Sequence, residues 1–107
     1  MQTKPIVSTR ADDPELDERI DRFVVDLAER VDAFQDAEAA RDRETLRVLA
    51  RDLAAEAAAL GYPLLVDAAG RIAEACGEGA PEALHKSVED LTELSQRVRR
   101  GHRSAAS

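Results

Sequence analysis

The side chains that could perform chemistry are few and far apart in this sequence. Glu82 and His85 have the Glu-x-x-His spacing that places a carboxylate and an imidazole on one helical face, as in di-iron helical bundles. That kind of site needs a second such pair and a glutamate from each of two other helices, and the sequence has one pair. Because Leu84 is the better core residue, we predict that His85 lies at the surface and that there is no metal site.

The remaining candidates for a reactive group are Cys76 and His102. Cys76 falls at a core position of a predicted helix, where a free cysteine behaves as a small hydrophobic residue. His102 belongs to the end of the chain and receives no role. The sequence also lacks a Gly-rich phosphate loop, a His-Glu-x-x-His pair and a Cys-x-x-Cys pair. We therefore predict that the protein is not an enzyme and needs no cofactor.

A strip of small and basic residues is the more informative feature. Arg47, Arg51, Ala54 and Ala58 follow one another at i, i+4, i+7 and i+11, with Ala55 beside them. On a helix this spacing gives a smooth face with two guanidinium groups at one end, opposite a stripe of leucines. Such a face suits the close approach of a partner. The alternative is that alanine is simply the best helix former and that the arginines are solubilising.

Composition limits the classes of partner. The 107 residues suffice for one domain. With 15 basic and 22 acidic residues the net charge is −7, which disfavours binding to nucleic acid and to anionic membranes. The exception is a short basic run near the end of the chain, which we predict to be a solvated tail; it comprises Arg97, Arg99, Arg100, His102 and Arg103.

The sequence also indicates a compartment. Its single cysteine can form neither an internal disulfide nor a zinc cluster. No apolar segment approaches the roughly 18 residues that a membrane-spanning helix needs, so we predict a cytoplasmic protein. Thirteen arginines against two lysines, together with twenty alanines, are typical of a GC-rich bacterial genome.

The elements that must position these residues are helices, because alanine is abundant and strand-forming β-branched residues are scarce. Apolar residues recur at spacings of three and four in four segments. Their predicted boundaries are Asp13 and Pro14 at the start of the first helix, Asp42 and Gly61 around the second, Pro63 and Gly77 to Gly79 around the third, and Pro81 and Gly101 around the fourth. We therefore predict an all-α fold. Because the links between the helices are short, neighbouring helices should run antiparallel and form an up-and-down four-helix bundle.

Two segments flank this bundle in the prediction. Residues 1–12 form an extended lead-in that docks through Ile6 and Val7, residues 13–101 form the bundle, and residues 102–107 form a flexible basic tail. Gly70 lies inside the third helix, where glycine costs about 1 kcal/mol relative to alanine. A close helix crossing is one explanation for it.

At the second helix the sequence resembles the bacterial histidine-phosphotransfer (HPt) domain. The resemblance extends over residues 5–8, 11–14, 23–31, 46–53, 60–63 and 67–69. The family signature on this helix reads His, any residue, Leu, Lys, Gly, then small residues up to an aromatic residue or Leu and a Gly. In residues 51–61, Leu53, Leu60 and Gly61 match this signature, whereas Arg51 stands at the phosphorylatable histidine, Ala54 at the assisting lysine and Ala55 at the glycine.

This resemblance implies a four-helix scaffold without the phosphotransfer chemistry. A guanidinium stays protonated and offers no nucleophile, so Arg51 cannot accept a phosphoryl group. The resemblance therefore implies a non-catalytic (pseudo-HPt) signalling module that binds the receiver domain of a response regulator, or a histidine kinase, through Arg47, Arg51, Ala54, Ala55 and Ala58.

Two alternatives stay open at this point. In the first, the chain is a structural or self-associating bundle with no phosphorelay role; in every reading we predict a monomer or a weak homodimer. In the second, His85 serves as an alternative phosphoacceptor, although it lies on the fourth helix and away from the face that family members present to receivers.

Overall fold

The protein consists of four helices. The computed structural model describes residues 5–106, with the side chains of all but residue 78 and residues 103–106. The helices are α1 (Asp17–Ala39), α2 (Arg43–Leu60), α3 (Pro63–Glu78) and α4 (Pro81–Ala106), and residues 5–106 contain no strand. The predicted all-α fold is confirmed.

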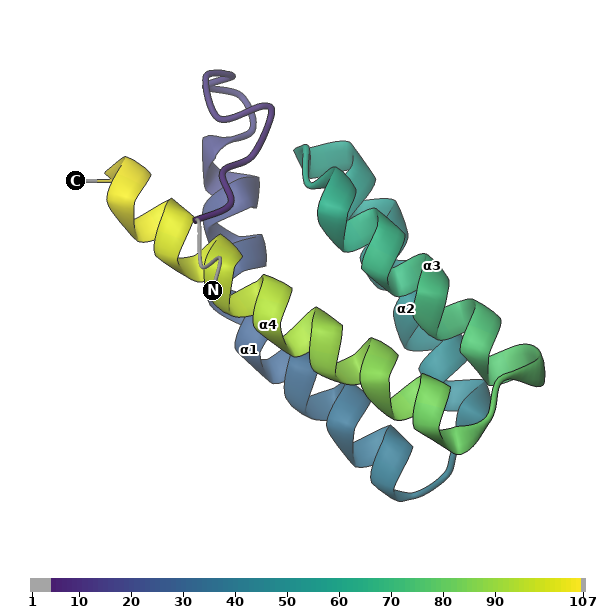
Figure 1. The fold of residues 1–107 in the computed structure, drawn as a ribbon. Helices are drawn as coiled ribbons and strands as arrows, with labels where there is room; N and C mark the ends of the chain where they lie inside the picture. The colour runs from purple at the N-terminus through teal and green to yellow at the C-terminus, as the bar shows by residue number, and fades with distance from the viewer. Residues whose placement is uncertain (1–4, 107) are drawn as a thin grey trace.

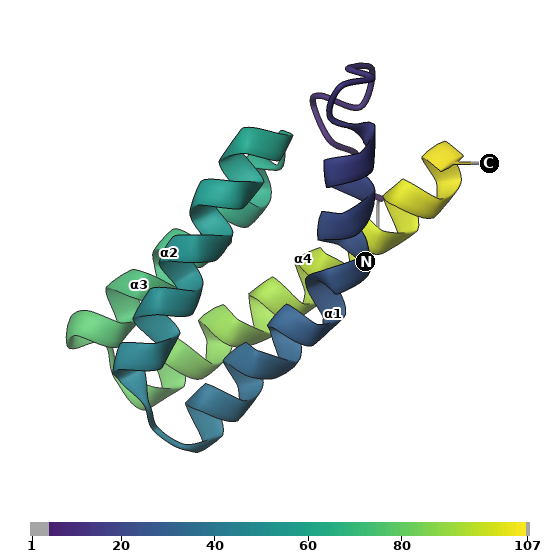
Figure 2. The ribbon, with the colours of Figure 1, turned by 180° about the vertical axis from the view of Figure 1, so that it is seen from behind.

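The helices form a ring in which each packs against its neighbours in the chain. α2 packs against α1 and α3, and α4 closes the ring against α3 and α1, while the backbones of the two diagonal pairs stay farther apart within the described residues. α3 and α4 lie in front in Figure 1, and α1 and α2 lie in front in Figure 2. The α1–α4 pair and the α2–α3 pair diverge toward the end where the lead-in lies (Figure 1). This arrangement is the expected up-and-down bundle.

The core lies along the axis of the ring. The recurring apolar positions of the helices supply most of it, and Tyr62, just before α3, adds to it. The largest fully buried side chains among the described residues are Phe34, Leu27, Leu46, Leu53, Leu60, Leu65, Ile72, Leu91, Val98 and Tyr62. Tyr62 stacks on Phe23, with ring centroids 5.6 Å apart and an interplanar angle of 22°. Burial also raises the pKa of Tyr62. This stacked pair joins α1 to the start of α3.

Most predicted helix boundaries are confirmed. Asp42 caps α2, since its carboxylate accepts from the Thr45 backbone N at 3.1 Å. Gly61 ends α2 in the left-handed region with φ of 84°, which glycine adopts without steric cost. Pro63 and Pro81 are the first residues of α3 and α4.

The predicted start of α1 at Asp13 and Pro14 is wrong by a few residues. Asp13 and Pro14 belong to a turn in which the Asp13 carboxylate accepts from the Glu15 backbone N at 3.0 Å and its carbonyl accepts from the Leu16 N. Regular helix begins at Asp17, and its N-cap Leu16 has no side-chain cap. The side chain that could cap the helix is thus used in the preceding turn.

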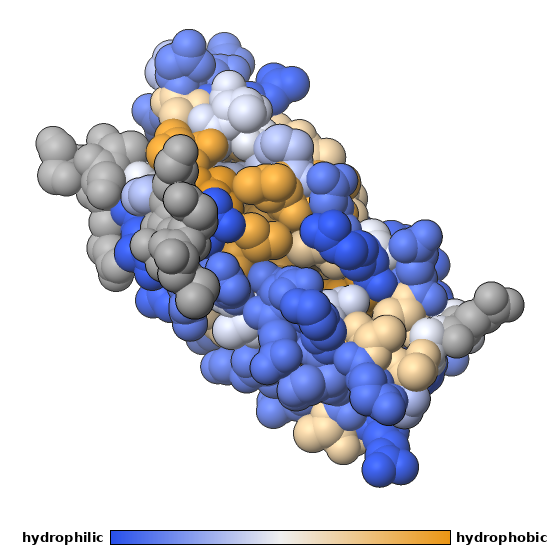
Figure 3. Space-filling view, viewed as in Figure 1, coloured by the Kyte–Doolittle hydropathy of each residue, from blue (hydrophilic) through white to orange (hydrophobic). Residues whose placement is uncertain are grey.

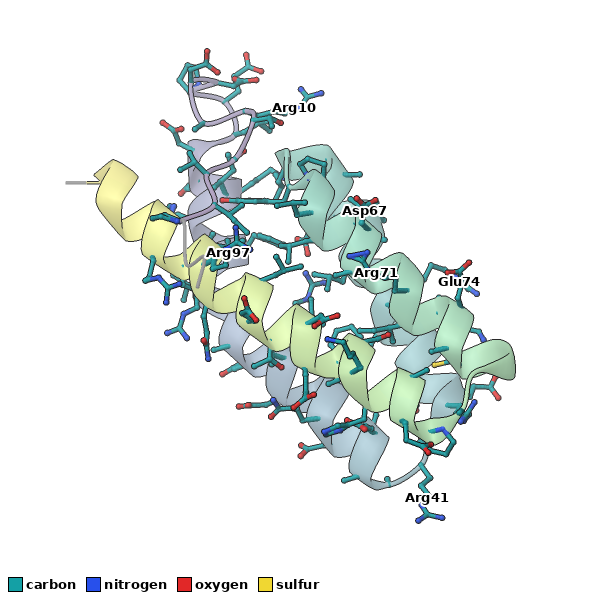
Figure 4. The ribbon with its side chains drawn as sticks, viewed as in Figure 1. Arg10, Arg41, Asp67, Arg71, Glu74 and Arg97 are labelled. Atoms are coloured by element: carbon teal, nitrogen blue, oxygen red, sulfur yellow. The ribbon has the colours of Figure 1, made fainter. Side chains whose placement is uncertain are left out.

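The predicted end of α4 at Gly101 is also wrong. α4 continues to Ala106, so the basic residues of the predicted tail, which run from residue 97 to residue 103, lie on this helix, and Ser107 lies outside the described residues. Gly101 is buried, and a Cβ at this position would overlap the carbonyl oxygen of Ile6. The Ile6 backbone N donates to the Arg97 carbonyl at 3.0 Å, and Figure 4 labels Arg97 where the lead-in meets α4. Gly101 therefore allows the lead-in to approach α4 rather than ending the helix.

The lead-in continues from α4 to the end of α2. The Ser8 hydroxyl, which is buried, donates to the Leu60 carbonyl, and the Thr9 backbone N donates to the Gly61 carbonyl at 2.8 Å. These bonds satisfy carbonyls that a helix C-terminus leaves without partners. Docking through Ile6, which is half-buried, agrees with the prediction, but Val7 is 49% exposed and points outward.

Gly70 does not lie at a close helix crossing, so that explanation is wrong. It is exposed in a shallow groove with Asp67, Arg71 and Glu74, three residues labelled in Figure 4, and a Cβ there would meet no atom within 4 Å. We expect Gly70→Ala to stabilise the protein by about 0.5 to 1 kcal/mol, because alanine has the higher helix propensity and restricts the unfolded chain. Urea denaturation measures this, and a loss of stability would contradict the open surroundings of Gly70.

Candidate docking site

The predicted strip on α2 divides into exposed and structural residues. Arg51, Ala55 and Ala58 are exposed, but Ala54 is half-buried and packs against the core. The interpretation that Ala54 lies opposite the leucine stripe is therefore wrong. Ala54 follows the buried Ala50 by four residues and precedes the buried Ala57 by three, so it borders the buried stripe.

Arg47 is exposed, but its side chain already makes a hydrogen bond within the fold. Its guanidinium donates to the carbonyl of Cys76 at 3.3 Å. Arg43, one turn earlier on α2, donates to the carbonyls of Ala75, Cys76 and Gly79 at 3.1, 3.2 and 3.1 Å. Both arginines thus place positive charge at the C-terminus of α3, where it stabilises the helix dipole. The sequence gives no signal for this arginine clamp (Arg43 and Arg47), because its acceptors are backbone atoms.

Cys76 lies beneath the arginine clamp. It is buried, as the sequence predicted, with 2% of its surface exposed. Burial raises the pKa of the Cys76 thiol, and the charges of Arg47 and Arg43 oppose this effect only in part. The thiol therefore stays protonated at neutral pH, and a protonated, buried thiol is a poor nucleophile.

The side of α2 away from the core presents a continuous surface. Its residues are Glu44, Val48, Arg51, Ala55 and Ala58, which we call the α2 outer face; all five are exposed. Among the helices of the described residues, α2 packs against α1 and α3 alone, and in Figure 2 the helix is seen from the side that no other helix covers. Val48 is 48% exposed and is one of four exposed large hydrophobic side chains among the described residues.

Arg51 stands in the middle of the α2 outer face. Its side chain makes no hydrogen bond or ion pair within the part of the chain that the structure describes, and the same holds for the side chain of Glu44. A guanidinium without a partner keeps five N–H donors that match a carboxylate or a phosphate. The chemistry available at this face is therefore recognition of an anionic group, without a nucleophile.

Both histidines of the chain lie on α4 and face carboxylates of α1. His85 Nδ1 is 2.8 Å from Glu38 Oε2, and its Nε2 is 3.6 Å from Glu89 Oε2. The predicted surface position of His85 is confirmed, since its side chain is 61% exposed. His102 Nε2 is 3.0 Å from Asp21 Oδ1. The two pairs lie near opposite ends of the contact between α1 and α4.

The Glu-x-x-His spacing of Glu82 and His85 does not correspond to a contact between their side chains among the described residues. The partners of His85 are Glu38 and Glu89 instead. Over the described residues, no group of three or more His, Cys, Asp or Glu side chains is arranged to hold a metal ion.

The contacts of His85 predict a measurable pH dependence. The hydrogen bond with Glu38, then the charges of Glu38 and Glu89, raise the pKa of His85 above its ordinary value of 6.5 against the opposing effect of desolvation. Because the folded state binds this proton more tightly, the pair stabilises the fold fully below about pH 6.5 and loses that contribution as the pH rises through the raised pKa. NMR titration of the His85 ring should show the raised pKa, and Glu38→Gln should return it toward 6.5.

A matched change on α1 serves as the control for this titration. Glu29 is exposed on α1 and does not pair with His85, so Glu29→Gln should leave the pKa of His85 unchanged. A parent pKa at or below 6.5 would show that the Glu38 contact does not form in solution.

Two other surface regions were not indicated by the sequence. A groove of about 630 Å³ between α1 and α2 contains Arg30, which pairs with Glu56 and lies over the Phe23 ring. A second region is apolar and lies between the lead-in and α3 (Figure 3). The exposed large hydrophobic residues on these two elements are Val7 and Leu64. The exposed position of Val7 differs from the predicted inward docking.

Comparison with known proteins does not assign the chain to a family. No protein-family model, no curated protein and no solved structure matches this chain. Within residues 5–106, no helix has the length and apolar character needed to cross a membrane.

Proposed function

We propose that the chain is a non-catalytic, HPt-like module of a two-component phosphorelay. It binds the receiver domain of a response regulator, or a histidine kinase, through the α2 outer face and accepts no phosphoryl group. One observation carries this proposal: an unpaired Arg51 occupies the middle of an uncovered helix face that bears no imidazole. The sequence resemblance places the phosphorylatable histidine of the family at this position.

The physical basis for binding is charge complementarity with close approach. The resemblance implies that the partner presents an acidic phosphoacceptor pocket. A guanidinium forms short, charge-assisted hydrogen bonds with carboxylates. Ala55 and Ala58, which follow Arg51 on the same exposed face, carry no bulky side chain that would hold a partner away. Arg51 can therefore enter an acidic pocket while the two alanines contact its rim.

Titration calorimetry against receiver domains from the same genome tests the proposal. We expect Arg51→Glu to weaken binding at least tenfold, since it puts a carboxylate against an acidic pocket. Arg99→Glu is the matched control, because Arg99 is exposed on α4 and outside the proposed interface. Binding of neither a receiver nor a kinase to the parent protein, or equal binding by both variants, would overturn the proposal.

A phosphotransfer assay tests the missing chemistry separately. Incubation with a phosphorylated receiver or an active histidine kinase should leave the chain unlabelled, because the α2 outer face has no nucleophile. An acid-labile label that disappears in His85→Ala would instead assign phosphoacceptor activity to α4.

A further inference from the structure

The α2 outer face has the residue spacing of a helix-packing seam. Glu44, Val48, Arg51, Ala55 and Ala58 follow at intervals of four, three, four and three residues, which is the spacing of a coiled-coil contact line. The opposite side of α2 is already used, since Leu46, Ala50, Leu53, Ala57 and Leu60 are buried in the core. α2 therefore carries a second contact line, and no other helix covers it within residues 5–106.

The charges of this seam complement each other when the helix is paired with itself. Glu44 precedes Val48 by four residues, and Arg51 follows it by three. If α2 lies antiparallel to α2 of a second copy, with a two-fold axis between residues 47 and 48, residue 44 of each copy faces residue 51 of the other. The two Val48 side chains then meet beside the axis. The arrangement yields two Glu44–Arg51 ion pairs around an apolar contact.

Both charged groups are available for such pairing. The side chains of Glu44 and Arg51 have no ion pair or hydrogen bond within the described part of the chain, so no existing side-chain interaction must break. The 48% exposure of Val48 provides apolar surface that a second copy would bury. A closed two-fold interface of this kind uses the same patch on both subunits.

We infer that residues 44–51 of the α2 outer face dock a second copy of this chain in an antiparallel, two-fold arrangement held by Glu44–Arg51 pairs about Val48. The dimer is a concentration-dependent assembly of modest affinity, because one helix face contributes few large side chains. Dimer formation occupies Arg51, so it competes with any partner that this residue binds. The inference does not depend on the proposed receiver, because it concerns the chain alone.

A charge-swap series measured by sedimentation equilibrium at low salt tests the dimer. Arg51→Glu and Glu44→Arg should each weaken association at least tenfold, because each change puts like charges opposite one another across the axis. The double variant Glu44→Arg/Arg51→Glu should restore association to near the parent value. Arg99→Glu, an exposed charge reversal on α4, should have no effect, and added salt should weaken the parent dimer.

The outcomes separate self-association from receiver binding. A parent protein that remains monomeric at high concentration and low salt overturns the inference, as does a double variant that fails to recover. Thermal unfolding of each variant establishes that it is folded. The double variant should dimerise yet bind receivers poorly, since it lacks Arg51. Receiver binding without dimers, or dimers without receiver binding, therefore identifies which proposal fails.

Discussion

Gly61→Ala should destabilise the protein by about 2 kcal/mol. The φ of 84° at this residue costs an L-amino acid with a Cβ roughly 1 to 2 kcal/mol. A Cβ would also lie 2.6 Å from Thr9 Oγ1 and 2.9 Å from the Arg10 backbone N. The lead-in would have to shift, and the Thr9–Gly61 hydrogen bond would weaken with it. The backbone cost and the lost packing therefore act in the same direction.

Urea denaturation of Gly61→Ala beside Gly70→Ala measures this effect. The two changes are chemically identical and should have opposite signs, because Gly70 has a helical backbone and open space around it. Hydrogen exchange should further show reduced protection of the Thr9 amide in Gly61→Ala. Unchanged stability of Gly61→Ala would mean that the lead-in does not rest on the end of α2 in solution.

Arg43→Ala should cost about 2 to 3 kcal/mol. The guanidinium of Arg43 is partly buried and donates to three carbonyls at the end of α3. Hydrogen bonds from a charged donor contribute more than neutral ones, and acceptors left without a partner keep their desolvation cost. The positive charge also interacts favourably with the helix C-terminus. Removing the side chain loses these contributions together, and Arg47 reaches only the Cys76 carbonyl.

Arg43→Lys distinguishes geometry from charge in this contact. A single ammonium keeps the charge but cannot span the carbonyls of Ala75 and Gly79 as a planar fork does, so it should recover less than half of the loss. Arg99→Ala, at an exposed position on α4, should change the free energy of unfolding by at most about 0.5 kcal/mol. An Arg43→Ala variant as stable as Arg99→Ala would refute the clamp.

The sequence by itself determined the helices and most of their ends. The spacing of apolar residues selects one buried stripe per helix, and that stripe needs no knowledge of its partners. The residues that begin or end helices act on the backbone next to them, so their effects can be predicted from the sequence. They are Asp42, Gly61 and the two helix-starting prolines. The exposed position of Arg51 followed in the same way, because it lies opposite residues that must be buried.

Only the tertiary structure decided which residues of the predicted strip remain at the surface. The spacing in the sequence places Ala54 and Arg47 on the exposed strip, but Ala54 borders the core and Arg47 binds the end of α3. Gly101 looked like a helix end, yet contact with the lead-in gives it a different role. In each case the deciding partner is remote in sequence and is often a backbone atom. The spacing of residues along a helix carries no information about such a partner, so the contact becomes known only from the tertiary structure.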